Sequence, residues 1–198
     1  MTNLAKRKKA ELRFKFYGIF SVFLSLLFVA ILMQNIFSAG IGGFYKTVFV
    51  TSINFDQNLL NLEDNPSEEQ IKKSSFRKLI KYNFNELFKE YSKDEIKKIK
   101  KLFYRKIDIE LKNFLINNPE FLNQTTNVDL TTSTHIDQIH KGNFDRTVPE
   151  KQRSVNNLQL NIYDKFIDEK KVKKVWNSTY FTSGDSRDPE SAGVASSV

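Results

Sequence analysis

The most prominent pattern in the chain is an apolar stretch near its N-terminus. Between Phe16 and Phe37 there is no charged residue, and fourteen of these 22 positions are Leu, Ile, Phe or Val. As an α-helix this segment reaches roughly 33 Å, enough to cross a hydrocarbon core of about 30 Å. Its apolar residues occupy every face, whereas a surface helix of a soluble protein is apolar on one stripe only. The pattern therefore predicts a transmembrane helix over residues 16–38.

A cleaved signal peptide is the main alternative for this segment. The apolar part of a signal peptide is about 7–15 residues long and is followed by a cleavage site with small residues. The stretch in this chain is longer, and Ser38, Ala39 and Gly40 make a poor cleavage site. A helix that spans the membrane and is retained is therefore the preferred interpretation.

The charges that flank the apolar stretch predict its orientation. One acidic residue, Glu11, precedes it, together with six basic residues: Lys6, Arg7, Lys8, Lys9, Arg13 and Lys15. In the segment that follows, Lys46 is the first basic residue. Because basic residues concentrate on the cytoplasmic side, residues 1–15 are expected to be a cytoplasmic lead-in and residues 39–180 an extracytoplasmic domain. In a bacterium this places the helix in the inner membrane and the domain in the periplasm.

Alternation of apolar and polar residues predicts strands in the domain. From Thr47 to Asp56 the chain is rich in β-branched and aromatic residues, as a half-buried pleated surface requires. Phe49, Ile53 and Phe55 share one face of this segment. A second alternating stretch, Val128 to Thr132, is expected to pair with it. These two segments predict a small sheet.

Apolar residues at steps of three and four predict helices around that sheet. Asn65, Pro66 and Glu68 are typical of a helix start, and the stripe that follows extends to Tyr91. Ser92 and Glu95 form a capping box for a second helix, which continues until Pro119 ends it. Gly142 is expected in a turn, and a last helix is expected to begin near Pro149. The predicted fold class is α+β and mostly helical, with a small sheet.

The formal net charge of +8 raises the question of nucleic-acid binding. Without the N-terminal segment, however, 25 basic residues face 22 acidic ones. Most of the basic residues are lysines interleaved with acidic residues, whereas nucleic-acid binders concentrate basic residues in a stripe rich in arginine. The charge therefore indicates membrane topology and a solvated surface, and we expect no nucleic-acid partner.

The sequence contains no pattern typical of an enzyme or a metal centre. There is no cysteine, and no glycine-rich phosphate loop follows a strand. His135 and His140 are five residues apart, which does not place both on one helix face, so a metal site with the nearby aspartates is not favoured. We therefore expect no catalytic residue, no metal ligand and no cofactor.

The C-terminal run from Trp176 to Gly193 resembles the junction of PstA-type permease subunits of phosphate ABC importers. The matching residues are Phe181, Gly184, Asp185, Ser186, Arg187, Pro189, Glu190, Ala192 and Gly193. The block from Lys9 to Gly18 is also similar to the lead-in of that family's first helix. In this subset of the family an N-terminal membrane helix and an extracytoplasmic domain precede the permease core.

The resemblance implies a permease subunit of an importer for inorganic phosphate. Its implied partners are membrane lipid, a second permease subunit, an ATPase subunit and a periplasmic phosphate-binding protein. Residues 181–198 would lead into a permease core that this chain lacks, together with the pore and the coupling loop, so the chain looks like an N-terminal portion, and Ala192–Val198 like the first turn of the next helix. A single-pass interaction or scaffold protein, or a membrane-tethered sensor, remains an alternative.

The junction motif also permits local structural expectations. Gly184 is expected to allow a turn with positive φ, and Asp185 or Ser186 to cap the segment that follows. Pro189 and Glu190 suit the first turn of a helix. These features are typical of a segment that leads the chain back into the membrane. An ordinary surface turn is the alternative interpretation.

Overall fold

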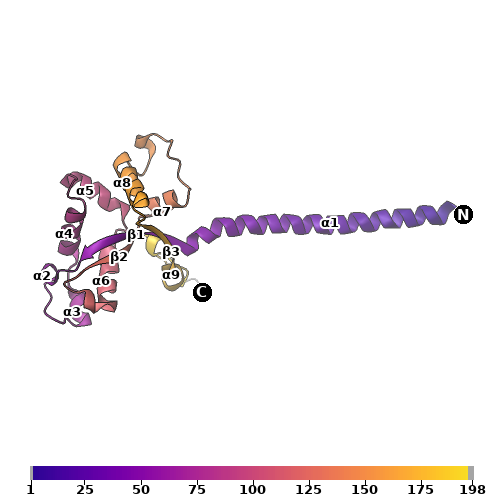
Figure 1. Ribbon diagram of the computed structural model, residues 1–198. Helices are drawn as coiled ribbons and strands as arrows, with labels where there is room; N and C mark the ends of the chain where they lie inside the picture. Colours follow the sequence, from indigo (N-terminus) through magenta and orange to yellow (C-terminus); the bar gives the residue numbers. More distant parts are fainter. Residues whose placement is uncertain (1, 196–198) are drawn as a thin grey trace. The chain divides into compact units, whose positions relative to one another are not determined.

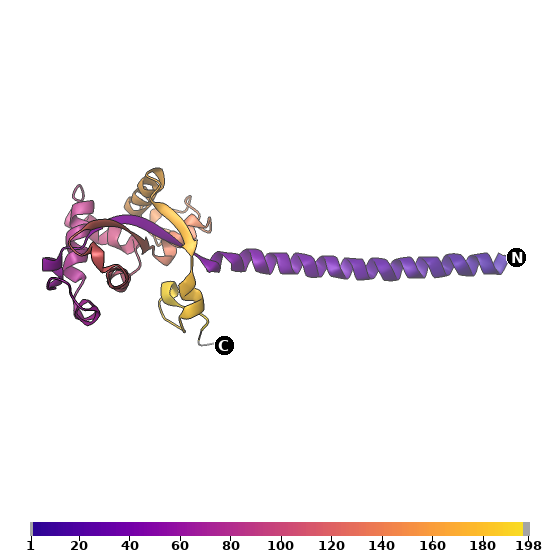
Figure 2. The ribbon, with the colours of Figure 1, turned by 60° about the horizontal axis from the view of Figure 1, so that its bottom comes forward.

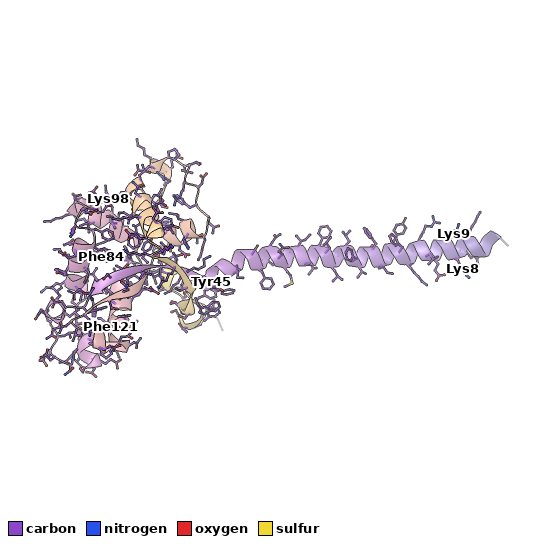
Figure 3. All side chains as sticks on the ribbon, in the orientation of Figure 1. Lys8, Lys9, Tyr45, Phe84, Lys98 and Phe121 are labelled. Atoms are coloured by element: carbon purple, nitrogen blue, oxygen red, sulfur yellow. The ribbon has the colours of Figure 1, made fainter. Side chains whose placement is uncertain are left out.

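The computed structural model describes residues 2–195 and divides into two compact units, Met1–Gly43 and Phe44–Val198. The first unit is helix α1 (Thr2–Ile41), which is continuous through the basic lead-in and the predicted segment 16–38. Lys8 and Lys9 project from it (Figure 3). By length and composition it could cross a membrane, and its most apolar stretch is 0% buried. Residues 16–38 thus lie within one helix, and this helix begins well before its first apolar turn.

The second unit, which we call the domain, is built on a three-stranded antiparallel sheet with the order β2-β1-β3 (Figure 1). The central strand β1 (Tyr45–Asn54) pairs with β2 (Thr125–Thr131) through its second part and with β3 (Val172–Trp176) through its first part. The two predicted strands and their pairing are confirmed. The third strand was not predicted.

Helices surround this sheet. They are α2 (Gln57–Leu60), α3 (Glu68–Lys73), α4 (Arg77–Leu87), α5 (Lys93–Ile99), α6 (Ile107–Asn117), α7 (Thr134–His140), α8 (Asn157–Asp168) and α9 (Ser178–Thr182). Short 3-10 helices join them: η1 (Gly42–Phe44), η2 (Lys100–Leu102), η3 (Pro119–Phe121), η4 (Glu150–Gln152) and η5 (Pro189–Ser191). With α1 included, the chain is therefore α+β and mostly helical, as predicted.

Several predicted helix boundaries are corrected. The long helix expected from Asn65 is two helices, and Asn65 itself has a left-handed backbone with φ 57°. Ser67 begins α3 through a capping box with Gln70, two residues after the predicted cap. The predicted box of Ser92 and Glu95 is confirmed at α5. The second long helix is likewise interrupted, because the chain leaves α5 through η2 and α6 begins at Ile107.

The last long helix also begins later than predicted. The segment after Pro149 forms only η4, and α8 starts where Asn156 makes a capping box with Gln159. A proline followed by polar residues favours a helix start, but the reciprocal side-chain and backbone hydrogen bonds of a capping box satisfy more of the free backbone groups. Gly142 has φ 80°, which confirms the predicted turn.

Phenylalanines from the sheet and helices form the centre of the hydrophobic core. We call Phe49, Phe84, Phe103 and Phe166 the core aromatic cluster; each is at most 5% exposed. The Phe49 ring lies 4.5 Å from that of Phe166 and 5.2 Å from that of Phe103, between ring centroids. Ile53 and Phe55, predicted on the same face of the strand as Phe49, are 0% exposed. The predicted inner face of β1 is therefore confirmed.

Side chains of two helices form hydrogen bonds with the two ends of β1. At its end, the side chain of Asn83 in α4 accepts from Asn54 N at 2.7 Å and donates to Asn54 O at 3.0 Å. Near its start, Asp137 in α7 accepts from Thr47 N and Oγ1 at 3.0 and 2.8 Å. Lys141 pairs with Asp137 and donates to Tyr45 O. These bonds satisfy polar groups of the central strand, most of them part-buried, so they fix its position.

Candidate functional site

The start of the domain and the end of strand β3 meet at one end of the β1–β3 pair. Antiparallel pairing of β1 with β3 places Trp176 opposite Tyr45. Directly beyond this pair, Asn177 N donates to Phe44 O at 2.8 Å. Figure 2 shows α9 following β3 at this end. Phe44, the first residue of the domain, and Asn177, the first residue after β3, are thus joined by a hydrogen bond.

Five aromatic residues gather where these ends meet, and we call them the terminal aromatic cluster: Phe44, Tyr45, Trp176, Tyr180 and Phe181. The ring of Trp176 stacks on Phe181 at 5.3 Å with an interplanar angle of 6°. Phe181 stacks in turn on Phe44 at 5.6 Å. Phe181 is the first of the predicted motif residues, and the structure places it in this cluster.

The junction after Trp176 folds back on itself. Gly193 N donates to Gly184 O at 3.0 Å, and Val194 N donates to Tyr180 O at 2.8 Å. A Cβ at Gly193 would lie 2.3 Å from Ser183 O and 2.7 Å from Thr179 O. Because real Cβ atoms do not approach backbone oxygens so closely, only glycine fits at 193. We call residues 178–195 the junction lobe.

A carboxylate in the junction lobe joins it to the rest of the domain. Asp188 accepts from Arg105 at 2.7 Å and pairs with Lys106 at 2.6 Å. The side chain of Asp188 is 17% exposed. The hydrogen bond from Lys106 is the main reason that the pKa of Asp188 lies below its usual value. The ionised form of Asp188 is thus favoured in the docked lobe.

A second carboxylate makes a separate contact. Glu190 accepts from both Thr134 N and Thr134 Oγ1 at 2.7 Å, at the start of α7. The cap residue of that helix, Ser133, makes no side-chain capping bond, so Glu190 supplies an acceptor for the first free backbone donor. Pro189 occupies the first position of η5, as predicted for a first helical turn.

The other predicted motif residues have smaller structural roles. The Ser186 hydroxyl lies 2.8 Å from that of Ser191 and accepts from Asp188 N. The predicted cap by Asp185 or Ser186 is wrong, because η5 begins after Asp188, which makes no side-chain capping bond. Asp185 and Arg187 are exposed. The predicted positive φ at Gly184 is wrong: in residues 2–195 only Gly142 among the glycines has one. The lobe turns back here without a left-handed residue, and Gly193 N bonds to Gly184 O.

Part of the predicted junction falls outside the described chain. Ala192 has an extended backbone, and residues 193–195 are not helical. The predicted first turn of a following helix extends over residues 196–198, which lie outside the described residues.

Sequence reasoning missed the partners that hold the junction lobe. Asp188, Arg105 and Lys106 were not singled out, and 83 residues separate Asp188 from Arg105. Thr134 was missed for the same reason, since its partner Glu190 is 56 residues away. Only the alternation of basic and acidic residues hinted at ion pairs, and it did not specify which residues pair.

A cavity of about 750 Å³ lies beside these contacts, with Asp188 and Glu190 in its wall. Four cationic side chains also line it: Arg77, Lys100, Lys101 and Arg105. Lys100 is half-buried, and its pKa is lowered by burial and by repulsion from Lys81. The cavity is therefore lined by both cationic and acidic side chains, with Phe103 and Ile107 as apolar lining.

The two histidines do not come together in a metal site. His140 Nδ1 lies 3.0 Å from the Tyr163 hydroxyl, whereas His135 is exposed beside the cavity. Asp137, one of the nearby carboxylates, is occupied by Thr47 and Lys141. In residues 2–195 no group of three or more His, Asp or Glu side chains is arranged to hold a metal ion.

Residues 1–150 match the family described as a domain of unknown function, DUF3333. This match covers most of the chain, and the chain therefore belongs to the DUF3333 family. The matched range contains α1 and the domain as far as the segment after α7. No curated protein matches, and no solved structure matches.

Proposed function

We propose that this chain is the N-terminal portion of a membrane permease subunit of an ABC importer for inorganic phosphate. In this proposal α1 spans the inner membrane with its N-terminus in the cytoplasm, and the domain lies in the periplasm. The pore and the coupling loop belong to a permease core that follows the junction lobe. The chain itself has no enzymatic activity and requires no cofactor.

The observation that carries the proposal is that the start of the domain meets the end of its last strand, β3. Phe44 and Asn177 are joined backbone to backbone at 2.8 Å. Domains with adjacent ends are readily inserted into a loop, because the flanking segments need not separate. This arrangement suits an extracytoplasmic domain between a first membrane helix and a permease core. The resemblance of residues 181–193 to the permease junction supports the same order of parts.

The charge asymmetry of α1 supports the orientation. The basic residues of the lead-in all precede the uncharged segment Phe16–Phe37 on one continuous helix. The cost of moving such charges through a bilayer, about 3 kcal/mol each at its centre, favours leaving them in the cytoplasm.

Two experiments on the full-length protein test the proposal. The first is co-purification, in which we expect the protein to bring down a second permease subunit and an ATPase subunit. Failure to recover either subunit from solubilised membranes would contradict the permease assignment. The second uses a reporter that is active only in the periplasm, fused after Lys141. We expect activity there, and an inactive reporter in a stable fusion would refute the orientation.

The cavity favours a second candidate function, that of a single-pass interaction or scaffold protein. The cationic side chains of the cavity include Lys100, whose pKa is lowered by burial and by the charge of Lys81. Such a wall is complementary to an acidic segment of a periplasmic partner. If Lys100→Gln and Lys101→Gln abolished partner binding but left phosphate uptake unchanged, this second function would be preferred.

A further inference from the structure

The terminal aromatic cluster is more exposed than its composition leads one to expect. Trp176 is 54% exposed, Phe181 is 44% exposed and Tyr45 is 38% exposed. Trp176 is also the only tryptophan in the chain. Stacked rings that remain this open to water indicate a surface with an interaction partner, because soluble proteins seldom leave large apolar groups clustered on the surface.

The cluster has one face that combines aromatic and cationic side chains. Tyr45 and Trp176 are directly paired across β1 and β3, so they point to the same side of the sheet. Lys174 precedes Trp176 by two positions and shares that side. It is exposed. Tyrosine, tryptophan and lysine on one face match the chemistry of a layer of anionic lipid headgroups above acyl chains.

The length of the chain between Ile41 and Tyr45 limits how far Tyr45 can lie from the end of α1. That helix ends at Ile41, and Tyr45 is four residues further along the chain. Four extended residues reach at most about 14 Å. The headgroup region on each side of a bilayer is about 5–8 Å thick beyond the hydrocarbon core. A domain tethered this closely to a spanning helix has the cluster within reach of the headgroups.

We propose that the terminal aromatic cluster lies in the headgroup layer of the outer leaflet and holds the domain against the membrane surface. This inference rests on the proposed function, because it requires α1 to span the membrane. In this arrangement the indole N–H of Trp176 and the hydroxyl of Tyr45 donate hydrogen bonds to lipid oxygens. Phe181 and the stacked ring of Trp176 lie against the upper acyl chains.

The single tryptophan provides a direct test. The full chain is reconstituted into vesicles of phosphatidylethanolamine and phosphatidylglycerol, some containing phospholipids brominated close to the headgroup. We expect the emission of Trp176 to be blue-shifted and to lose intensity in the brominated vesicles. Iodide present on both sides of the membrane is expected to quench it only weakly.

A matched control moves the tryptophan to the far end of the domain. In the double variant Trp176→Phe, Tyr82→Trp, the reporter replaces a side chain that is 44% exposed. Tyr82 adjoins Asn83, which bonds to Asn54 at the other end of β1. That end is about 30 Å from Tyr45 at 3.3 Å per strand residue. Here we expect strong iodide quenching and no loss of emission with brominated lipid.

The outcomes separate this inference from the proposed function. If the chain does not float with the vesicles, membrane anchoring by α1 is wrong. If it floats but Trp176 is quenched by iodide and not by brominated lipid, the domain stands away from the membrane and only this inference is overturned. If Trp176 is shielded from both quenchers, another protein surface covers the cluster, and the inference is overturned as well.

Discussion

The domain contains two aromatic clusters that differ in their surroundings. In the core aromatic cluster, the rings of Phe49, Phe84, Phe103 and Phe166 are at most 5% exposed. In the terminal aromatic cluster, the distances between ring centroids are similar, but the rings are exposed to solvent, and Trp176 is 54% exposed. Figure 3 places Phe84 inside the domain and Tyr45 at the end where β1 begins.

The comparison shows that ring stacking by itself does not define a hydrophobic core. The core rings are enclosed by helices on the sheet, so their burial stabilises the fold. The terminal rings come from the start of the domain and from the end of β3 with α9, and they have no such cover among residues 2–195. We therefore expect substitutions in the core cluster to affect folding and substitutions in the terminal cluster to affect membrane association.

The largest expected effect is that of Phe49→Ala. Phe49 is 0% exposed and contacts two other rings, so the cavity left behind is expected to lower the free energy of unfolding by about 3–5 kcal/mol. The matched variant Phe181→Ala removes a half-exposed ring that stacks on Phe44 and Trp176, and it is expected to change this free energy by only about 1 kcal/mol. Urea unfolding of the full chain in detergent, followed by near-ultraviolet circular dichroism, measures both. Equal losses would show that the two clusters do not differ as described.

A smaller and more local effect is expected from Gly193→Ala. Its added Cβ meets three backbone oxygens at 2.3–2.8 Å, so the junction lobe must open. We expect faster hydrogen exchange at the amides of Val194 and Ala195, which are bonded within the lobe, while the amides of β1 stay protected. Gly42→Ala is the control, because nothing lies within 4 Å of its added Cβ. Unchanged exchange in Gly193→Ala would contradict the folded-back lobe.

Local and long-range features differ in how far the sequence predicts them. The capping box of Ser92 and Glu95 was predicted because its hydrogen bonds join residues three positions apart. The strand β3 was missed because it is short and carries Lys173 and Lys174, so it lacks a clear alternation. The meeting of Tyr45 with Trp176 depends on that strand and was therefore not predicted.

The residues of the candidate site show the same difference between local contacts, which the sequence predicts, and long-range contacts, which it does not. The junction motif drew attention to Glu190, but its partner Thr134 is set by the tertiary fold. Asp188 was overlooked although it makes two ion pairs, since nothing near it in the sequence indicates Arg105 or Lys106.

Acidification is expected to release the junction lobe through Asp188. The pKa of Asp188 is lowered in the folded protein, so its ion pairs stabilise the docked lobe above the usual aspartate pKa of about 3.9. That stabilisation is lost as the pH falls through the lower folded value. Exchange at the Val194 amide should therefore increase relative to the β1 amides in this range. In Asp188→Asn the increase should already be present at neutral pH, and wild-type protection there would contradict the role of Asp188.

The smallest expected effect concerns His140. Burial is the main reason that its pKa is lowered, with Lys174 and Lys141 opposing protonation and Asp137 favouring it. The unfolded chain therefore binds a proton more readily, and stability should decrease as the pH falls from 7 through about 6.5 towards the folded value. We expect the melting temperature of His140→Gln to depend less on pH over this interval. An identical slope in both proteins would exclude His140 as the cause.

Membrane insertion with the domain outside underlies both proposals, and cysteine labelling measures it most directly. The chain has no cysteine, so Lys8→Cys and Asn143→Cys each create a unique thiol at an exposed position, one on α1 and one on the domain. With a reagent that does not cross the inner membrane, in cells whose outer barrier has been opened, we expect Asn143→Cys to be labelled. We expect Lys8→Cys to be labelled only after the inner membrane is permeabilised. Labelling of Lys8→Cys alone in intact cells, or release of a domain that has lost residue 8, would contradict the retained helix and its orientation.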